Sequence, residues 1–141
     1  MKVRITRLDR SLPLPARETS GAAGFDLSAS ADLTIAPGGI ALVPTGLVIK
    51  VPDGYFLGIF ARSSTPLKRG LMVANGVGVI DTDYCGPDDQ VKVQVLNFTG
   101  APVHVKRGDR IAQGIFLKHA PPEWDEGEPV GPTRGGFGST G

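Results

Sequence analysis

Apolar and polar residues alternate with a period of two in several short segments of the chain. Residues 2–6 and residues 90–98 show this alternation, which predicts strands with one buried face. Residues 32–51 consist of short apolar runs separated by turns at residues 37–39 and 44–46, which indicates a meander of strands. Residues 55–61 form a largely apolar run that predicts a central strand. Because the sequence shows no long helical period and no internal repeat, we expect an all-β fold.

The composition fits one small domain of this kind. The 141 residues suffice for one modest core, so we expect a single domain over residues 1–141. Glycine and proline are abundant, at 20 and 12 residues, yet hydrophobic residues still make up 40% of the chain and are spread along it. This balance predicts many short strands and turns rather than disorder.

Charge and cysteine content narrow the class of protein. The formal net charge of +1 argues against a surface built to bind nucleic acid or an anionic membrane. Residues 1–10 are too charged for a secretory signal, and no segment approaches membrane-spanning length. The single cysteine, Cys85, excludes an internal disulfide framework, and two histidines leave little for a Cys/His zinc site. We expect a soluble cytoplasmic protein.

Residues 74–86 are the first candidate for a functional site. Gly76 and Gly78 lie in a β-branched run, so the backbone can bend there or approach a ligand, and a hairpin of this kind can bind a flat ring through main-chain groups. Asp81 and Asp83 follow directly, and then Tyr84. The same pattern is also typical of a bulge that ends in a turn. An EF-hand calcium loop is excluded because a lysine occupies the position of its bidentate glutamate.

Three further polar positions interrupt predicted strands or follow them. Asp26 lies between apolar neighbours and is either a functional carboxylate or a cap of the preceding loop. Residues 62–65, Arg-Ser-Ser-Thr, combine a cation with three hydroxyls that suit a phosphate, or they form a polar strand end whose serines cap a short turn over residues 65–69. Gln113 has apolar neighbours, so its amide binds a ligand or the backbone.

The C-terminal part of the chain, from residue 120 onward, lacks the strand pattern of the preceding residues. Residues 120–133 predict an irregular surface connection, with Trp124 packed onto the body of the protein. Residues 134–141 contain four glycines, so ordering them is costly, and they resemble an arm that orders on a ligand, or else a disordered tail. The sequence contains neither a P-loop nor a Rossmann glycine motif.

Taken in order, these clusters resemble one family, the trimeric deoxyuridine triphosphatases, from about residue 21 to the C-terminus. The five motifs that carry the resemblance are Ala23-Gly24-Phe25-Asp26-Leu27, Ala61-Arg62-Ser63-Ser64, Asn75-Gly76-Val77-Gly78-Val79-Ile80-Asp81-Thr82-Asp83-Tyr84, Gly108-Asp109-Arg110-Ile111-Ala112-Gln113 and Gly135-Gly136-Phe137-Gly138-Ser139-Thr140-Gly141. One difference is that Arg134 directly precedes the paired glycines, whereas the family's arginine stands further upstream.

The resemblance implies roles for individual residues. Asp81 is implied as the general base that orients the attacking water, and Tyr84 as the ring that packs on deoxyribose and excludes a ribose. Asp26 is implied to hold a Mg²⁺ ion through water. The implied substrate contacts are uracil at Asn75, Gly78, Val79 and Ile80, the phosphates at Arg62, Ser63, Ser64 and Gln113, and the arm residues Arg134, Phe137, Gly138, Ser139 and Thr140.

The resemblance also implies an activity and an assembly. The family cuts dUTP to dUMP and pyrophosphate with Mg²⁺, which supplies dUMP for dTMP synthesis and keeps uracil out of DNA. Its fold is a jelly-roll-like β-barrel in a homotrimer with shared sites, and the glycine-rich arm, here about residues 132–141, crosses to a neighbour. Two alternatives remain open: a dCTP deaminase, which shares the fold, and a nucleotide-binding protein without catalysis.

Overall fold

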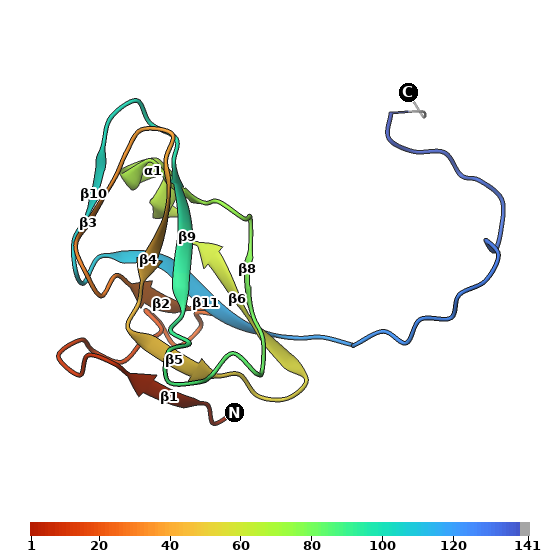
Figure 1. Cartoon of the computed structure of the whole chain (residues 1–141), viewed down its shortest axis with the longest axis horizontal. Helices are drawn as coiled ribbons and strands as arrows, with labels where there is room; N and C mark the ends of the chain where they lie inside the picture. Colours follow the sequence, from red (N-terminus) through yellow and green to blue (C-terminus); the bar gives the residue numbers. More distant parts are fainter. Residues whose placement is uncertain (139–141) are drawn as a thin grey trace.

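The computed structural model describes residues 1–138 and confirms the expected all-β fold. The described chain contains eleven short strands and one helix (Figure 1). These elements are β1 (Arg4–Arg7), β2 (Phe25–Ser28), β3 (Leu33–Ile35), β4 (Ile40–Pro44), β5 (Leu47–Lys50), β6 (Tyr55–Ala61), α1 (Ser64–Arg69), β7 (Leu71–Val73), β8 (Gly78–Ile80), β9 (Lys92–Asn97), β10 (Val103–Val105) and β11 (Arg110–Lys118). The strands predicted over residues 2–6, 55–61 and 90–98 correspond to β1, β6 and β9.

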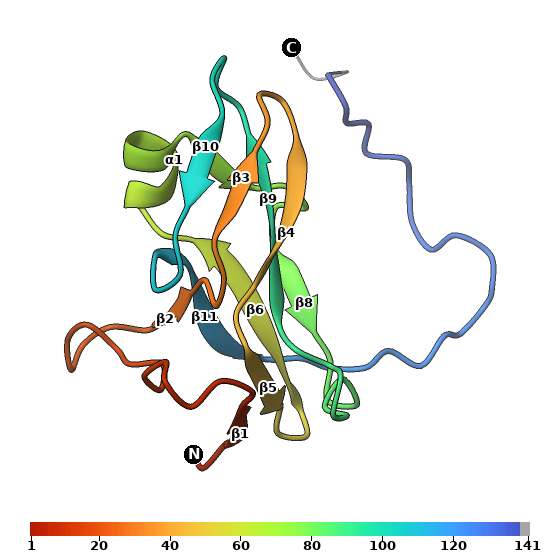
Figure 2. The ribbon, with the colours of Figure 1, turned by 60° about the vertical axis from the view of Figure 1, so that its left-hand side comes forward.

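The strands form four antiparallel sheets around one core. The largest sheet has the order β2-β11-β6-β8, the second has the order β4-β9-β7, and β1-β5 and β10-β3 are two-stranded. Both ribbon views show these sheets wrapped around a common interior (Figures 1 and 2). One cluster of buried side chains joins all of them, and its members include Leu27, Ile35, Val43, Ile49, Leu57, Val93, Val105 and Ile111. Burial of this apolar surface is the main term that stabilises the fold.

Helix α1 lies where only a short turn was expected. It follows β6 and ends at Arg69. Gly70 comes next with a φ of 64°, a left-handed conformation that glycine adopts without strain. The buried Thr65 side chain fixes the helix to the sheet, because its hydroxyl donates a hydrogen bond to the Ile111 carbonyl at 3.0 Å. The helix therefore holds the end of β6 against the start of β11.

The prediction of a hairpin around Gly76 and Gly78 is wrong. β7 pairs with β9, whereas β8 pairs with β6, so the turn between β7 and β8 passes from one sheet to another. Gly76 makes this turn with a φ of 73°. A Cβ at Gly78 would lie 3.1 Å from the Cβ of Ile59, so the glycine lets β8 approach β6 closely. This close approach explains why β8 pairs with β6.

After β11 the chain leaves the body. Residues 119–138 contain no helix or strand, and residues 120–135 are exposed throughout (Figures 1 and 2). Trp124 is 90% exposed, so the expectation that it packs onto the body is wrong in the single chain. Pro121 and Pro122 favour an extended backbone, which carries Trp124 away from the sheets.

Within the described residues, no helix has the length and apolar character needed to span a membrane.

Candidate active site

Asp26 is the centre of a charged cluster built on three neighbouring strands. Its Oδ1 lies 2.7 Å from Nε of Arg62, and its Oδ2 lies 2.9 Å from Nη1 of Arg110. The sheet order explains this meeting, because β11 lies between β2, which carries Asp26, and β6, which ends just before Arg62. The Asp26 side chain is only 18% exposed, so it needs partners for its charge.

Arg110 extends the cluster toward solvent. Its Nη1 also lies 2.5 Å from Oε2 of Glu18, which belongs to the loop before β2. Hydrogen bonding to Asp26, together with the charges of Glu18 and Asp26, raises the pKa of Arg110 above its usual value. With two carboxylates and two guanidinium groups, the four side chains have no net charge. Phosphate binding would therefore depend on donor geometry rather than on an excess of positive charge.

Gln113 stands beside this cluster on β11. It is opposite Asp26 on β2 and opposite Phe60 on β6. Its side-chain Nε2 donates a hydrogen bond to the Ala61 carbonyl at 3.0 Å, so the amide nitrogen binds the backbone. A Cβ at Gly24 would lie 2.8 Å from the Gln113 Oε1, so the glutamine side chain would have to shift. The glycine of the first motif thus leaves room for the position that the glutamine of the fourth motif adopts.

Ser63 and Ser64 lie directly after Arg62, at the start of α1. Ser63 is the residue before the first helical residue, and it is exposed. Its hydroxyl makes no capping hydrogen bond, so the expectation that it caps the turn is not met. The Ser63 hydroxyl therefore remains available for a ligand next to the guanidinium of Arg62. We call Asp26, Arg62, Ser63, Ser64, Arg110 and Gln113 the phosphate half-site.

The residues around Gly78 form a second group. β8 is the outer strand of the largest sheet, so in the described chain only one of its two edges is paired, with β6. Asn75, Val79, Asp81 and Tyr84 are all exposed here. A hollow of about 130 Å³ lies against this strand, lined by Asn75, Gly78, Val79 and Ile80 together with residues of β4, β6, β7 and β9. We call residues 75–84 the base half-site.

Two hydrogen bonds hold the loop that follows β8. The Lys50 ammonium donates to the Thr82 carbonyl at 2.8 Å, and the Tyr84 hydroxyl donates to the Gln90 carbonyl at 3.2 Å. The first bond fixes the backbone next to Asp81, and the second fixes the ring of Tyr84. The Asp81 carboxylate itself is exposed at the end of the strand.

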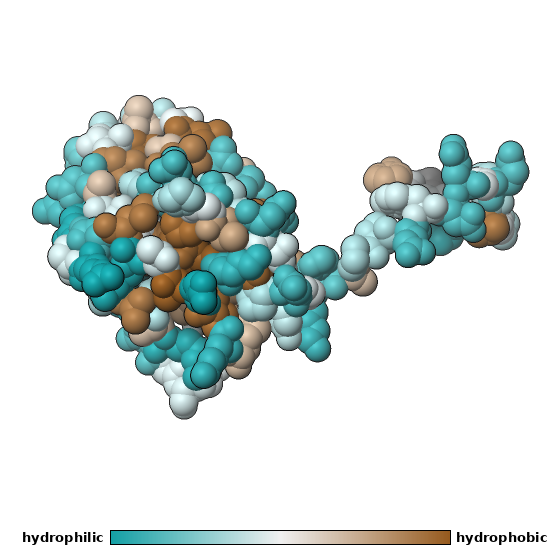
Figure 3. Space-filling view, turned by 60° about the horizontal axis from the view of Figure 1, so that its bottom comes forward, coloured by the Kyte–Doolittle hydropathy of each residue, from teal (hydrophilic) through white to brown (hydrophobic). Residues whose placement is uncertain are grey.

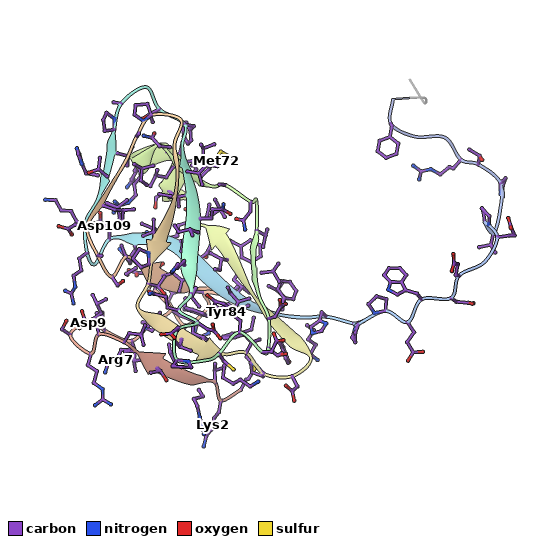
Figure 4. The ribbon with its side chains drawn as sticks, in the orientation of Figure 1. Lys2, Arg7, Asp9, Met72, Tyr84 and Asp109 are labelled. Carbon is purple, nitrogen blue, oxygen red and sulfur yellow. The ribbon has the colours of Figure 1, made fainter. Side chains whose placement is uncertain are left out.

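Asp81 of the base half-site and Arg62 of the phosphate half-site lie at opposite ends of β6, while Gly78 pairs with Ile59 nearer the Arg62 end. Ile80 pairs with Leu57, so Asp81 lies beside the start of β6, whereas Arg62 follows its last residue. At about 3.3 Å per residue, the six steps from Phe56 to Arg62 span about 20 Å. In Figure 4, Tyr84 of the base half-site and Asp109, next to Arg110, lie apart, with Asp109 at the left edge of the body. A single chain therefore does not bring Asp81 and Arg62 to one reacting phosphate.

The arm residues lie apart from both half-sites. Phe137 and Arg134 are exposed, and Phe137 has a φ of 49°, which is unusual for a residue other than glycine. Gly138 is exposed as well, and its φ is 88°. Ser139 and Thr140 fall outside the residues that the structure describes. The single chain thus brings Asp26, Arg62 and Gln113 together, but it leaves the base half-site and the arm separate.

The cluster fits a magnesium ion only in a limited way. The part of the chain that the structure describes has no group of three His, Cys, Asp or Glu residues that could hold a metal. Each carboxylate oxygen of Asp26 already faces a guanidinium, but a carboxylate has about four lone-pair sites, so it can still accept bonds from water. The residues fit an ion that is held mainly by substrate phosphates and reaches Asp26 through water.

Two residues near the half-sites were not singled out from the sequence. Arg110 belongs to the fourth motif, yet its bond to Asp26 depends on the pairing of β2 with β11. Lys50 reaches the loop after β8 across 32 positions of sequence. A cation within the fourth motif was a usable signal for Arg110, whereas no local pattern points to Lys50.

Comparison with known proteins supports one family. The family model described as dUTPase matches residues 10–141. The deoxyuridine 5'-triphosphate nucleotidohydrolase of Desulfitobacterium hafniense is 48% identical over 147 aligned positions, which cover 100% of this chain and 95% of the relative.

Solved structures agree with this result. The dUTPase of Streptococcus mutans matches with a TM-score of 0.79 at 37% identity and covers 88% of this chain and 100% of its own. A dUTPase variant of phage phi11 of S. aureus, whose description reports a structural Mg(II) ion, has a TM-score of 0.82 at 19% identity, with coverage of 92% and 99%, and supports the fold alone. Because the family model and the close relative span nearly the whole sequence, the chain belongs to the dUTPase family.

Proposed function

We propose that this protein hydrolyses dUTP to dUMP and pyrophosphate. The observation that carries the proposal is the match to the dUTPase family over residues 10–141. The clustering of Asp26, Arg62 and Gln113 supports it, because three motifs that are far apart in sequence meet at one place in the sheet. Pyrophosphate release from a deoxynucleotide is the reaction for which such a cluster and a separate carboxylate are suited.

The base half-site recognises uracil and deoxyribose. The unpaired edge of β8, at Gly78, Val79 and Ile80, offers main-chain N–H and C=O groups to the polar edge of the base, and Asn75 orders the turn before it. A ring bound in this way is read by the positions of its donors and acceptors. Tyr84 packs against the sugar, and its bond to Gln90 holds the ring where a 2′-hydroxyl would collide with it.

Asp81 acts as the general base. An aspartate is ionised at neutral pH, so a carboxylate within hydrogen-bond reach of a water can accept its proton. The water oxygen forms a bond to the α-phosphorus, and the bond between that phosphorus and the bridging oxygen to the β-phosphate breaks. Pyrophosphate leaves with the electron pair, and the proton passes from water to Asp81 and then to solvent.

The phosphate half-site holds the leaving group. Arg62, Ser63, Ser64 and Gln113 donate hydrogen bonds to the phosphate chain, and the bond from Asp26 orients Arg62 before substrate arrives. A magnesium ion bound by the phosphates would supply charge neutralisation at the leaving oxygens, and Asp26 would hold it through water. The dUTPase variant of phage phi11, which is 19% identical to this chain, has the same fold and is described with a structural Mg(II) ion.

Each complete site combines half-sites from different copies of the chain. The separation of about 20 Å along β6 supports this arrangement, because the α-phosphate must meet Asp81 while the next phosphates meet Arg62. We therefore propose a homotrimer in which the arm of a further copy closes each site. Phe137 covers the base, and Arg134, Gly138, Ser139 and Thr140 bind the terminal phosphate. The proposed location is the cytoplasm, where Cys85 remains a free thiol.

The deciding experiment is pyrophosphate release from dUTP, dTTP, dCTP and UTP in the presence of magnesium. Selective turnover of dUTP supports the proposal. Comparable turnover of all four nucleotides would refute the specificity. Ammonia release from dCTP would identify a deaminase, and tight binding of dUTP without turnover would identify a binding protein.

A further inference from the structure

Glu18 is the member of the charged cluster that lies outside all five motifs. Its Oε2 lies 2.5 Å from Nη1 of Arg110, and the same nitrogen lies 2.9 Å from Oδ2 of Asp26. One guanidinium nitrogen is therefore shared between two carboxylates. The arm extends away from the body in the space-filling view (Figure 3), so in the described chain both of these carboxylates come from the body.

The loop between β1 and β2 is fixed on both sides of Glu18. Before it, the Ala16 carbonyl accepts a hydrogen bond from the N–H of Asp26 at 3.1 Å. After it, the Arg17 guanidinium donates to the Ser20 carbonyl at 3.1 Å and closes a turn. The backbone therefore holds Glu18 beside the strand that carries Asp26, and the contact with Arg110 follows from this placement.

A second ion pair joins the same loop to the turn that precedes β11. Oδ2 of Asp9 lies 2.6 Å from Nη2 of Arg107. Figure 4 shows Asp9 and Asp109 along the same edge of the body. Because Arg110 is the first residue of β11, the loop contacts the beginning of this strand at two places. The contact made by Glu18 is the one that leads on to the phosphate half-site.

A hollow of about 220 Å³ lies between this loop, β2 and the beginning of β11. Its charged lining residues are Asp9, Glu18, Asp26 and Arg110. The hollow has room for water and polar groups to bind it. Asp26 therefore faces space that water can occupy, in addition to its two guanidinium partners.

The bonds that Asp26 can still accept depend on how firmly Arg110 holds it. A carboxylate has about four lone-pair sites, and Arg62 already uses one of them. Arg110 divides its Nη1 between Asp26 and Glu18. Without the Glu18 charge, Arg110 would turn to Asp26 alone, and the net charge of the four side chains would rise from zero to +1. Both changes would make Asp26 a poorer partner for a hydrated cation.

We propose that Glu18 is a positioning residue of the phosphate half-site, which draws Arg110 away from Asp26 and so keeps Asp26 open to magnesium-bound water. This inference rests on the proposed function, in which the phosphate chain is bound together with Mg²⁺. The Glu18 side chain is 70% exposed, so solvent damps its direct field at the phosphates. Its effect therefore passes through Arg110.

The experiment compares the binding of inorganic triphosphate with and without magnesium, measured by calorimetry on the full-length protein. Triphosphate has the phosphate chain without the base, so it tests the phosphate half-site whichever nucleotide the enzyme uses. Glu18→Gln should lower the ratio of the affinity with magnesium to the affinity without it about three- to tenfold, because the Arg110 charge then lies closer to the ion. A merely structural role of Glu18 would change both affinities by one factor. An unchanged ratio would overturn the proposal.

Two control variants separate the local charge from other effects. Glu18→Asp keeps the carboxylate and should restore most of the wild-type ratio. Asp53→Asn removes one exposed carboxylate in the turn before β6, at the end of that strand away from Arg62, and should leave the ratio unchanged. An equal fall in Asp53→Asn would assign the effect to net charge and would refute a specific role of Glu18. The Tm of Glu18→Gln should stay within about 2 °C of the wild type, because exposed substitutions seldom alter stability much.

A second background tests whether Glu18 acts through Arg110. In an Arg110→Gln protein, the further change Glu18→Gln should alter the ratio by less than about twofold, since no guanidinium is left to share. A further fall as large as the one in the wild-type background would contradict the assigned route. Failure of the proposed function is distinguishable, because it would appear as absent or unselective dUTP turnover in the wild type while the triphosphate results stand. Absent binding of triphosphate to the wild type would overturn the inference itself.

Discussion

The phosphate half-site and the base half-site differ in how complete they are within one chain. Asp26, Arg62 and Arg110 satisfy one another across three strands, and Gln113 is fixed to the backbone. The base half-site instead presents an unpaired strand edge and an exposed carboxylate at Asp81. Part-buried charges need partners before the substrate arrives, whereas groups that read a base must be free to bind it. The difference shows that the fold preorganises charge but leaves base recognition open.

The largest expected effect is on the catalytic rate and concerns the base half-site. Asp81→Asn should bind dUTP but lose about 10²- to 10⁴-fold in kcat, since the amide cannot accept a proton from water. Pyrophosphate release gives the rate, and calorimetry with a non-hydrolysable analogue gives the affinity. Asp83→Asn is the matched control, because it changes an exposed carboxylate two residues away and should retain nearly full activity. Near-normal turnover by Asp81→Asn would remove Asp81 as the base.

The next experiment joins the two half-sites. Arg62→Gln and Asp81→Asn chains should each be nearly inactive alone, because each assembly then lacks one half-site function. Co-expressed chains should regain activity well above either parent, since some sites combine an intact Arg62 from one copy with an intact Asp81 from another. Activity of purified mixed assemblies is the measurement. If mixing restores nothing, each site is built within one chain.

Tyr84 tests how the base half-site excludes ribonucleotides. Tyr84→Ala should lower the preference for dUTP over UTP by roughly tenfold to a few hundredfold, because the ring no longer blocks a 2′-hydroxyl. The measured quantity is the ratio of kcat/KM for the two nucleotides. Tyr84→Phe loses only the hydroxyl that donates to Gln90 and should retain most of the preference. An unchanged ratio in Tyr84→Ala would assign the discrimination to another group.

The smallest expected effect concerns the loop that supports Arg110. Asp109 accepts hydrogen bonds from Nη1 of Arg69 at 2.8 Å and from the Lys106 N–H at 2.9 Å. The bond from Arg69, in the first place, lowers the pKa of Asp109 below its ordinary value of 3.8. A folded pKa below the unfolded one adds stability above the unfolded pKa, and this stability is lost as the pH falls through the folded pKa.

Asp109→Asn should therefore lower the free energy of unfolding by about 1 kcal/mol or less at pH 7, and the difference from wild type should shrink below about pH 4. Urea unfolding at pH 7 and at pH 3 measures this. The base half-site should not respond, so the affinity for deoxyuridine should match that of the wild type. A difference in stability that grows toward low pH would contradict the assigned role of Asp109.

The strands with clear alternation were predictable from the sequence. Asp26, Arg62 and Gln113 were also singled out from it, whereas Arg110 was not. The pairing of β8 with β6 was not predictable, because the short run from Gly78 to Ile80 pairs with a strand about 20 residues earlier. The prediction that Trp124 packs onto the body of the protein failed for a different reason. An aromatic residue usually packs, but neighbouring prolines carry this one away from the nearest surface.

The contact between Asp26 and Arg110 illustrates a further limit of prediction from the sequence alone. Both residues lie in recognisable motifs, yet their meeting follows from the order β2-β11-β6, which no local pattern contains. The roles of Ser139 and Thr140 remain predictions from the family resemblance, since they lie beyond the described residues.

The arrangement of functional residues along strand β6 constrains how copies of the chain can assemble. Since Asp81 lies beside one end of this strand and Arg62 follows the other end, two copies that bring these residues to one substrate must meet through different surfaces, head to tail. Heterologous contacts either close into a ring or continue as an open filament. A closed ring has as many complete sites as members and leaves no half-site idle, whereas a lone subunit has none. Catalysis by this protein would therefore vanish on dilution below the dissociation constant of the ring, even though every chain stayed folded.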